Sequence, residues 1–123
     1  MRNGTLVLVL ALLCAAAGCE RELNDPLYGQ AKKYEETAFT LSSAAIAKDA
    51  ATPERLAAIR KEAAVTAGFT SPEDARAQLK AYLESGDAAK VAVAYKIIDL
   101  AMKNNKEIEA LLAKKRQSVP SGT

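Results

Sequence analysis

The hydrophobic positions divide the chain into an apolar N-terminal run and four segments with helical spacing. Residues 6–17 carry no charge, and from residue 25 onward apolar side chains recur three and four residues apart. This spacing places them on one face of an α-helix. The sequence has no run that alternates apolar and polar residues, as a half-buried strand would. The pattern therefore predicts an all-α fold.

Start and stop signals set the bounds of the four predicted helices. Asp25, Thr52 and Ser71 each precede a proline, which suits an N-cap followed by the first helical position. Gly68 suits the left-handed residue that closes a helix, and Phe69 can fold back onto the last turn. The expected helices run from Asp25 to about residues 48–51, from Thr52 to Gly68, from Ser71 to Ser85 and from Asp87 to Arg116.

These helices predict a small bundle of about four helices, with the first and last long and the two between them short. The simplest assembly has the long helices antiparallel and the short pair packed across them. The last helix carries a broad apolar arc that includes Tyr95 and Met102, so we expect neighbours on two of its sides and Met102 in the core. Asn104 and Asn105 interrupt this arc.

The first nineteen residues have the pattern of a secretory signal. Arg2 precedes the uncharged run, small residues follow it, and the run is shorter than the roughly 20 residues of a membrane span. Ala16-Ala17-Gly18-Cys19 resembles the lipobox of bacterial lipoproteins, although leucine is commoner where Ala16 stands. In that class the cysteine thiol receives diacylglycerol, the signal is cut just before it, and the new amine is usually acylated, often with palmitate.

The resemblance implies cleavage between Gly18 and Cys19 and a covalent lipid on Cys19, with no other cofactor. It divides the chain into a signal peptide (1–18), a lipidated tether (19–24), a helical bundle domain (25–116) and a flexible tail (117–123). Three alternatives remain open. An ordinary signal peptidase could cut after Ala17 or Gly18, the segment could stay uncut as an anchor, or Cys14 and Cys19 could form a disulfide.

Composition argues against several classes of function. The net charge is only +2, from 17 basic and 15 acidic residues, so we do not expect a nucleic-acid partner. The chain has no histidine, which removes the usual general base and the commonest metal ligand. Three pairs of acidic residues, Glu35-Glu36, Glu73-Asp74 and Glu107-Glu109, are better explained as solvated helix surface. We therefore predict no catalytic residues, no metal site and no enzymatic activity.

Tyr28, Tyr34, Tyr82 and Tyr95 are the candidates for an interaction surface, since a tyrosine can bury its ring and keep its hydroxyl wet. The alternative is that all four rings line the core. The predicted function is a membrane-tethered, non-catalytic helical interaction or scaffold module, with an envelope protein or a second copy of the chain as partner. A periplasmic ligand-binding or chaperone-like protein that uses a groove between helices is the alternative. Glu20 is not the aspartate that retains enteric lipoproteins at the inner membrane, so the resemblance implies an outer-membrane anchor facing the periplasm.

Overall fold

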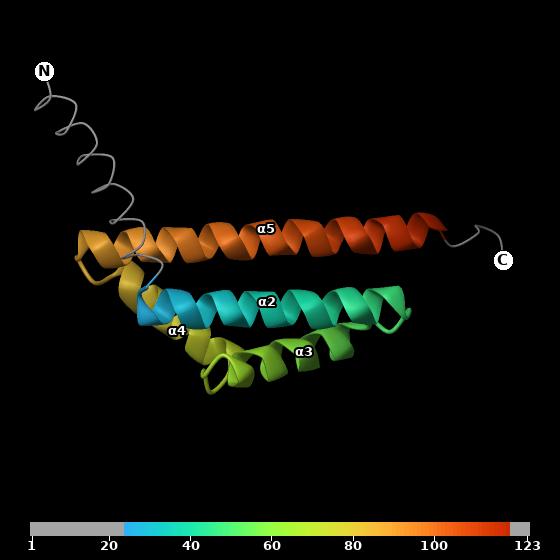
Figure 1. Ribbon diagram of the computed structural model, residues 1–123, viewed down its shortest axis with the longest axis horizontal. Coiled ribbons are helices and arrows are strands. Elements are labelled where there is room, and N and C mark those ends of the chain that lie inside the picture. The colour runs from blue at the N-terminus through green and yellow to red at the C-terminus, as the bar shows by residue number, and fades with distance from the viewer. Residues whose placement is uncertain (1–23, 119–123) are drawn as a thin grey trace, which may run out of the picture.

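Residues 24–118, the part of the chain that a computed structural model describes, contain four helices and no strand (Figure 1). This confirms the predicted all-α bundle with two long helices and two short ones between them. The signal peptide, Gly18, Cys19, most of the tether and residues 119–123 lie outside the described residues. The helices are α2 (Pro26–Ala47), α3 (Pro53–Thr66), α4 (Pro72–Leu83) and α5 (Ala88–Ser118).

Side-chain caps start the first three helices where the sequence predicts them. The Oδ1 of Asp25 accepts from the backbone N–H of Leu27 at 2.8 Å, and the Oγ1 of Thr52 accepts from Arg55 at 3.1 Å. The Oγ of Ser71 accepts from Asp74 at 3.0 Å. Each bond satisfies a backbone donor that has no partner within the helix.

Two helices end in a left-handed residue. Gly68 has a φ of 93°, and the next N–H, of Phe69, donates to the carbonyl of Ala64 at 2.9 Å, which buries the Phe69 ring as predicted. At the end of α2 the same role falls to Asp49, with a φ of 58°. A non-glycine residue in this conformation is strained.

The two long helices run parallel, so the predicted antiparallel arrangement is wrong (Figure 1). Asn104 of α5 lies beside Glu35 of α2, and Lys115, further along α5, reaches Ala47 at the C-terminal end of α2. The reason is that α3 and α4 do not reverse direction between them. They continue one after the other as a bent return leg, of 14 and 12 residues, against the 22 residues of α2.

The core is centred on α2, and its side chains are most completely buried where α3 packs against α2. The Ile59, Ala63 and Ala64 side chains of α3 have an exposed fraction of 0%. The alanines at positions 63 and 64 let the two helices approach closely. The apolar side chains of α2 that recur three and four residues apart are buried except for Leu41, which is half-buried. The buried ones are Leu27, Ala31, Tyr34, Ala38 and Ala45.

The outer part of the apolar arc on α5 is not covered. Tyr95 is 59% exposed and Met102 is 58% exposed, so the predicted place of Met102 in the core is wrong. Both neighbours of α5, the helices α2 and α4, lie against its inner face, which buries Val93, Ala94 and Ile97. Helix α5 also continues to Ser118, two residues past the predicted end at Arg116.

Candidate functional site: a cleft at the bend between α3 and α4

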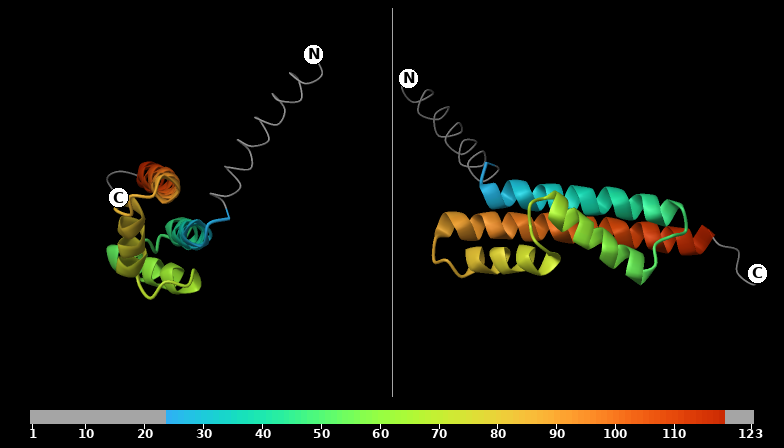
Figure 2. Two further views of the ribbon diagram at one scale, coloured as in Figure 1. Left: turned by 90° about the vertical axis from the view of Figure 1, so that its left-hand side faces the viewer. Right: turned by 90° about the horizontal axis from the view of Figure 1, so that it is seen from below.

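A cavity of about 300 Å³ opens where the return leg bends. We call it the cleft. Helix α3 packs on α2, whereas α4 crosses to α5, as the end-on view in Figure 2 shows. Since α4 leaves α3 at the bend, space remains between α2, α4 and α5 that side chains only partly fill. Its apolar walls come from Leu27, Phe69, Pro72, Ala75, Leu79 and Ile97.

Glu35 lines the cleft and is the most deeply buried charged residue among those described, with an exposed fraction of 5%. Its Oε1 lies 3.6 Å from the Nη1 of Arg60, an ion pair that is long for a hydrogen bond. Its Oε2 is buried and has no hydrogen-bond partner within the described part of the chain. An unsatisfied buried acceptor costs about 1–3 kcal/mol, and more when it is charged.

Burial raises the pKa of the Glu35 carboxyl above its ordinary value of 4.5. The nearby guanidinium of Arg60 opposes this effect, but it does not cancel it. Desolvation dominates because the carboxylate lies among apolar walls and the ion pair is long. A buried carboxyl with a perturbed pKa beside a cavity is a common feature of binding and active sites.

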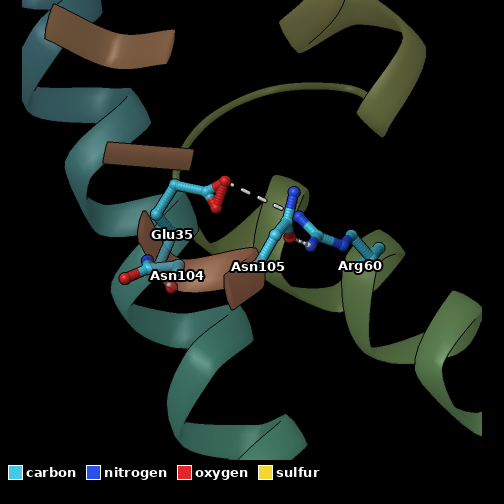
Figure 3. A network of polar contacts seen from close by, with 4 residues as sticks. All are labelled: Glu35, Arg60, Asn104 and Asn105. Carbon is cyan, nitrogen blue, oxygen red and sulfur yellow. Dashed lines mark hydrogen bonds and ion pairs between the residues drawn. The ribbon is translucent and has the colours of Figure 1, made fainter. Parts of the chain in front are cut away.

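Arg60 makes polar contacts with residues of α2 and α5 at the polar end of the cleft (Figure 3). From α3 its side chain passes over the ring of Tyr34, 5.8 Å from the centroid, and its Nη2 donates to the Oδ1 of Asn105 at 2.8 Å. The preceding residue, Asn104, donates from Nδ2 to the backbone carbonyl of Glu35 at 3.3 Å. The two asparagines that interrupt the apolar arc of α5 therefore tie it to α3 and α2 beside Glu35.

The four tyrosines do not lie on one surface. Tyr34 is buried and packs edge-on against Phe69, with ring centroids 6.1 Å apart. Tyr28 and Tyr82 are half-buried against the core, and Tyr95 is exposed on the far side of α5. The hydroxyl of Tyr82 donates to the Asp25 carboxylate at 3.0 Å, and burial together with that carboxylate raises the pKa of Tyr82.

Most of the acidic pairs lie on the helix surface. Glu36 is exposed and pairs with Lys32, and Glu73 pairs with Arg76. Asp74 accepts from the backbone of Thr70, one residue before the cap, at 2.9 Å, which lowers the pKa of Asp74. Between residues 24 and 118 no group of three or more potential metal ligands gathers. No helix in that same range is both long and apolar enough to cross a bilayer.

Glu35 is a site residue that the sequence pattern did not predict, because an adjacent acidic pair such as Glu35-Glu36 is typical of solvated helix surface. A signal was present in the spacing. Glu35 lies four residues after Ala31 and seven before Ser42, and all three side chains are buried on the same flank of α2. A charge on the edge of an apolar stripe is a reason to look for a partner on a facing helix. Arg60 is that partner, and nothing in the local sequence brings the two together.

Comparison with known proteins gives no family. No protein-family model, no curated protein and no solved structure matches the chain.

Proposed function

We propose that this chain is a lipid-anchored protein of the bacterial cell envelope whose helical domain is a non-catalytic binding module. It is held at the outer membrane through Cys19, faces the periplasm and binds its ligand in the cleft. The lipobox-like sequence supports the anchor. The observation that carries the binding proposal is the unsatisfied Oε2 of Glu35 beside a cavity with apolar walls.

The cleft has the composition of a ligand site. Binding sites for small molecules are concave, mostly apolar and supplied with a few polar groups that fix orientation. Here the apolar walls come from α2, α4 and α5, and the polar groups Glu35, Arg60 and Asn105 gather at one end. A volume of about 300 Å³ is at the lower end of the range for such sites. This favours the ligand-binding alternative over a module that only docks to other proteins.

The residues that line the cleft favour binding over catalysis. Hydrolysis by paired carboxylates needs two acidic groups that face each other. Glu35 is the single carboxylate among the side chains that line the cleft, and its charged neighbours there are the arginines Arg60 and Arg76. The arrangement suits the holding of a molecule in one orientation.

The anchor is tested by labelling cells with radioactive palmitate and by mass spectrometry of the purified product. We expect label on the wild-type chain, a mature N-terminus at Cys19 and recovery in the outer-membrane fraction. Cys19→Ser removes the thiol, so it should abolish both the label and the membrane recovery. An unmodified thiol at Cys19, or another N-terminus, would contradict the anchor.

Binding in the cleft is tested by native mass spectrometry of the protein extracted from membranes. We expect a bound small molecule on the wild-type chain. Ala75→Phe places a ring in the cleft, and it should remove that molecule because Ala75 lines the wall. Ala81→Phe is the matched control, since Ala81 lies on the same helix and is exposed. Retention of the molecule by Ala75→Phe, or no bound molecule on wild type, would contradict the proposal.

A protein partner is the second candidate, and the exposed Tyr95 and Met102 on α5 favour it. Tyrosine and methionine are enriched in the centres of protein interfaces. The test is crosslinking in native membranes, followed by recovery of the chain. One stoichiometric envelope protein should be captured by wild type and by Lys103→Ser, and lost from the double variant Tyr95→Ser, Met102→Ser. Equal capture by all three would exclude this face.

A further inference from the structure

The polar end of the cleft lacks a hydrogen-bond donor for Glu35. The nearest donor group, the guanidinium of Arg60, lies 3.6 Å from Oε1, and its Nη2 is engaged by Asn105 at 2.8 Å. Oε2 is left with no partner among the described residues. Buried polar groups in folded proteins are nearly always satisfied, so a carboxyl this short of hydrogen bonds is a place where a bound molecule can supply a donor.

The charges around the cleft restrict which head group can donate a hydrogen bond to Glu35. Arg60 pairs with Glu35, and Arg76 at the wall of the cleft pairs with Glu73, so each guanidinium group already has an acidic partner. A cationic head group would bring another positive charge next to both guanidinium groups. An anionic head group would be repelled by Glu35. A neutral head group adds no charge beside a carboxylate that is already largely removed from water.

The hydrogen-bonding capacity of the Glu35 carboxyl narrows the choice of head group further. Burial raises the pKa of the Glu35 carboxyl and so favours its neutral form more than in an exposed glutamate. An ionised carboxylate only accepts hydrogen bonds, whereas the protonated form also donates. A hydroxyl group both donates and accepts, so it pairs with either form.

We propose that the cleft binds an apolar molecule bearing a neutral hydroxyl group. The hydroxyl pairs with the carboxyl group of Glu35, which lines the cleft, and the hydrocarbon part lies against Leu27, Phe69, Leu79 and Ile97. This inference rests on the proposed function, because it names the class of ligand that the same cleft takes. Its apolar walls exceed its polar groups in number, so the molecule is mainly hydrocarbon with a single polar end.

Four probes of similar size separate the possible head groups: 1-hexanol, methyl pentyl ether, hexylamine and hexanoate. The ether has the same atoms as the alcohol but no donor. Ligand-observed NMR titration of the full-length lipidated chain in phosphatidylcholine nanodiscs measures the affinity of each probe, with empty nanodiscs as the background. We expect 1-hexanol to bind at least about tenfold more tightly than the other three, as expected for one hydrogen bond to a charged acceptor.

Glu35→Met removes the acceptor and keeps a side chain of similar length. It should bind 1-hexanol and the ether equally, so the tenfold preference disappears while ether binding is retained. Retained ether binding also demonstrates that the variant is folded. Glu36→Met, which changes the exposed neighbour, should keep the preference.

The two proposals fail in different ways. If all four probes bind wild type equally, or if Glu35→Met keeps the preference for 1-hexanol, the cleft binds apolar molecules without the hydroxyl pairing, and only this inference is overturned. Tightest binding of hexylamine or hexanoate overturns it in favour of a charged head group. If no probe binds wild type, the cleft is not a site for such molecules and the proposed binding function falls with the inference.

Discussion

The return leg of the bundle has two halves that use similar residues and pack very differently. Helix α3 places Ile59, Ala63 and Ala64 against α2 with no exposed surface, whereas α4 has no side chain that is fully buried. Both helices carry alanines and a few larger aliphatic residues on their inner faces. The difference lies in geometry, because α3 lies along one helix and α4 crosses away from it to another. The change of direction at residues 67–71 therefore separates a close-packed interface from a cleft.

The largest expected contrast comes from removing one large aliphatic side chain from each half. Ile59→Ala leaves a cavity in the packed half and should lower the free energy of unfolding by about 4 kcal/mol. Leu79→Ala enlarges a space that is already open, and Leu79 is only half-buried, so the loss should be about 1 kcal/mol. Urea denaturation with an unchanged m-value measures both. Equal losses would show that the two halves are equally well packed.

The converse test enlarges one alanine in each half of the return leg. Ala63→Leu forces extra methylenes into a site with an exposed fraction of 0%, so it should cost about 3 kcal/mol. Ala75→Leu extends into the cleft and should change the free energy of unfolding by less than about 1 kcal/mol. Thermal melting of the two variants compares them directly. A cost for Ala75→Leu as large as that for Ala63→Leu would mean that the cleft closes in solution.

The bend itself is tested at Gly68. A side chain there must adopt a φ of 93°, and its Cβ would lie 3.0 Å from the Nε2 of Gln30, which bonds the carbonyl of Ala67 at 3.3 Å. Gly68→Ala should therefore cost about 2 kcal/mol, from backbone strain and the displaced Gln30. The control is Gly86→Ala, where φ is 74° but no atom lies within 4 Å of the added Cβ. Gly86→Ala should cost only the backbone strain, about 1 kcal/mol. Chemical denaturation measures the difference in stability between the two variants.

Much of the fold could be predicted from local sequence because its signals are local. Asp25, Thr52 and Ser71 cap the helices they were expected to cap, and Gly68 with Phe69 closes α3 as expected. The direction of the return leg could not be predicted, because the angle taken at residues 67–71 leaves no trace in helical periodicity. The antiparallel expectation and the burial of Met102 both failed for that reason.

The candidate site could not be predicted from the sequence for a related reason. Glu35 and Arg60 belong to different helices, and only the packing of α3 on α2 brings them together. Charged residues are rarely buried, so an adjacent acidic pair is normally assigned to the surface, and for Glu36 that assignment holds. The lipid anchor is the opposite case, because its signal is entirely local. It stays a prediction, since Cys19 lies outside the described residues.

Glu35 also predicts a pH dependence of stability that separates the cleft from the rest of the molecule. A carboxyl whose pKa is raised in the folded state binds a proton more tightly there than in the unfolded chain. Its contribution to stability is therefore fully present below pH 4.5 and is lost as the pH rises through the folded pKa. Asp74 has the opposite sign, since its lowered pKa makes its contribution disappear as the pH falls below 3.8.

Glu35→Gln should remove the decline in melting temperature between pH 4.5 and neutrality, because the amide does not titrate. Melting curves across this range, recorded for wild type, Glu35→Gln and Glu36→Gln, provide the measurement. Glu36→Gln should behave like wild type, since its side chain is 64% exposed. A wild-type melting temperature that does not fall over this interval would indicate that Arg60 fully compensates the buried charge.

The smallest expected effect is at the opposite end of the bundle, where Asp49 ends α2 in a left-handed conformation with a φ of 58°. Asp49→Gly relieves this strain, which is worth about 1 kcal/mol. It also removes the ion pair with Lys115, 3.4 Å away, but that pair is exposed and contributes about 0–1 kcal/mol. The net result should be a stabilisation of at most about 1 kcal/mol, measured by chemical denaturation. Asp49→Ala isolates the ion pair, since it loses the charge and keeps the strain, and it should be less stable than wild type. If Asp49→Gly is also less stable, the contact with Lys115 contributes more than the strain costs.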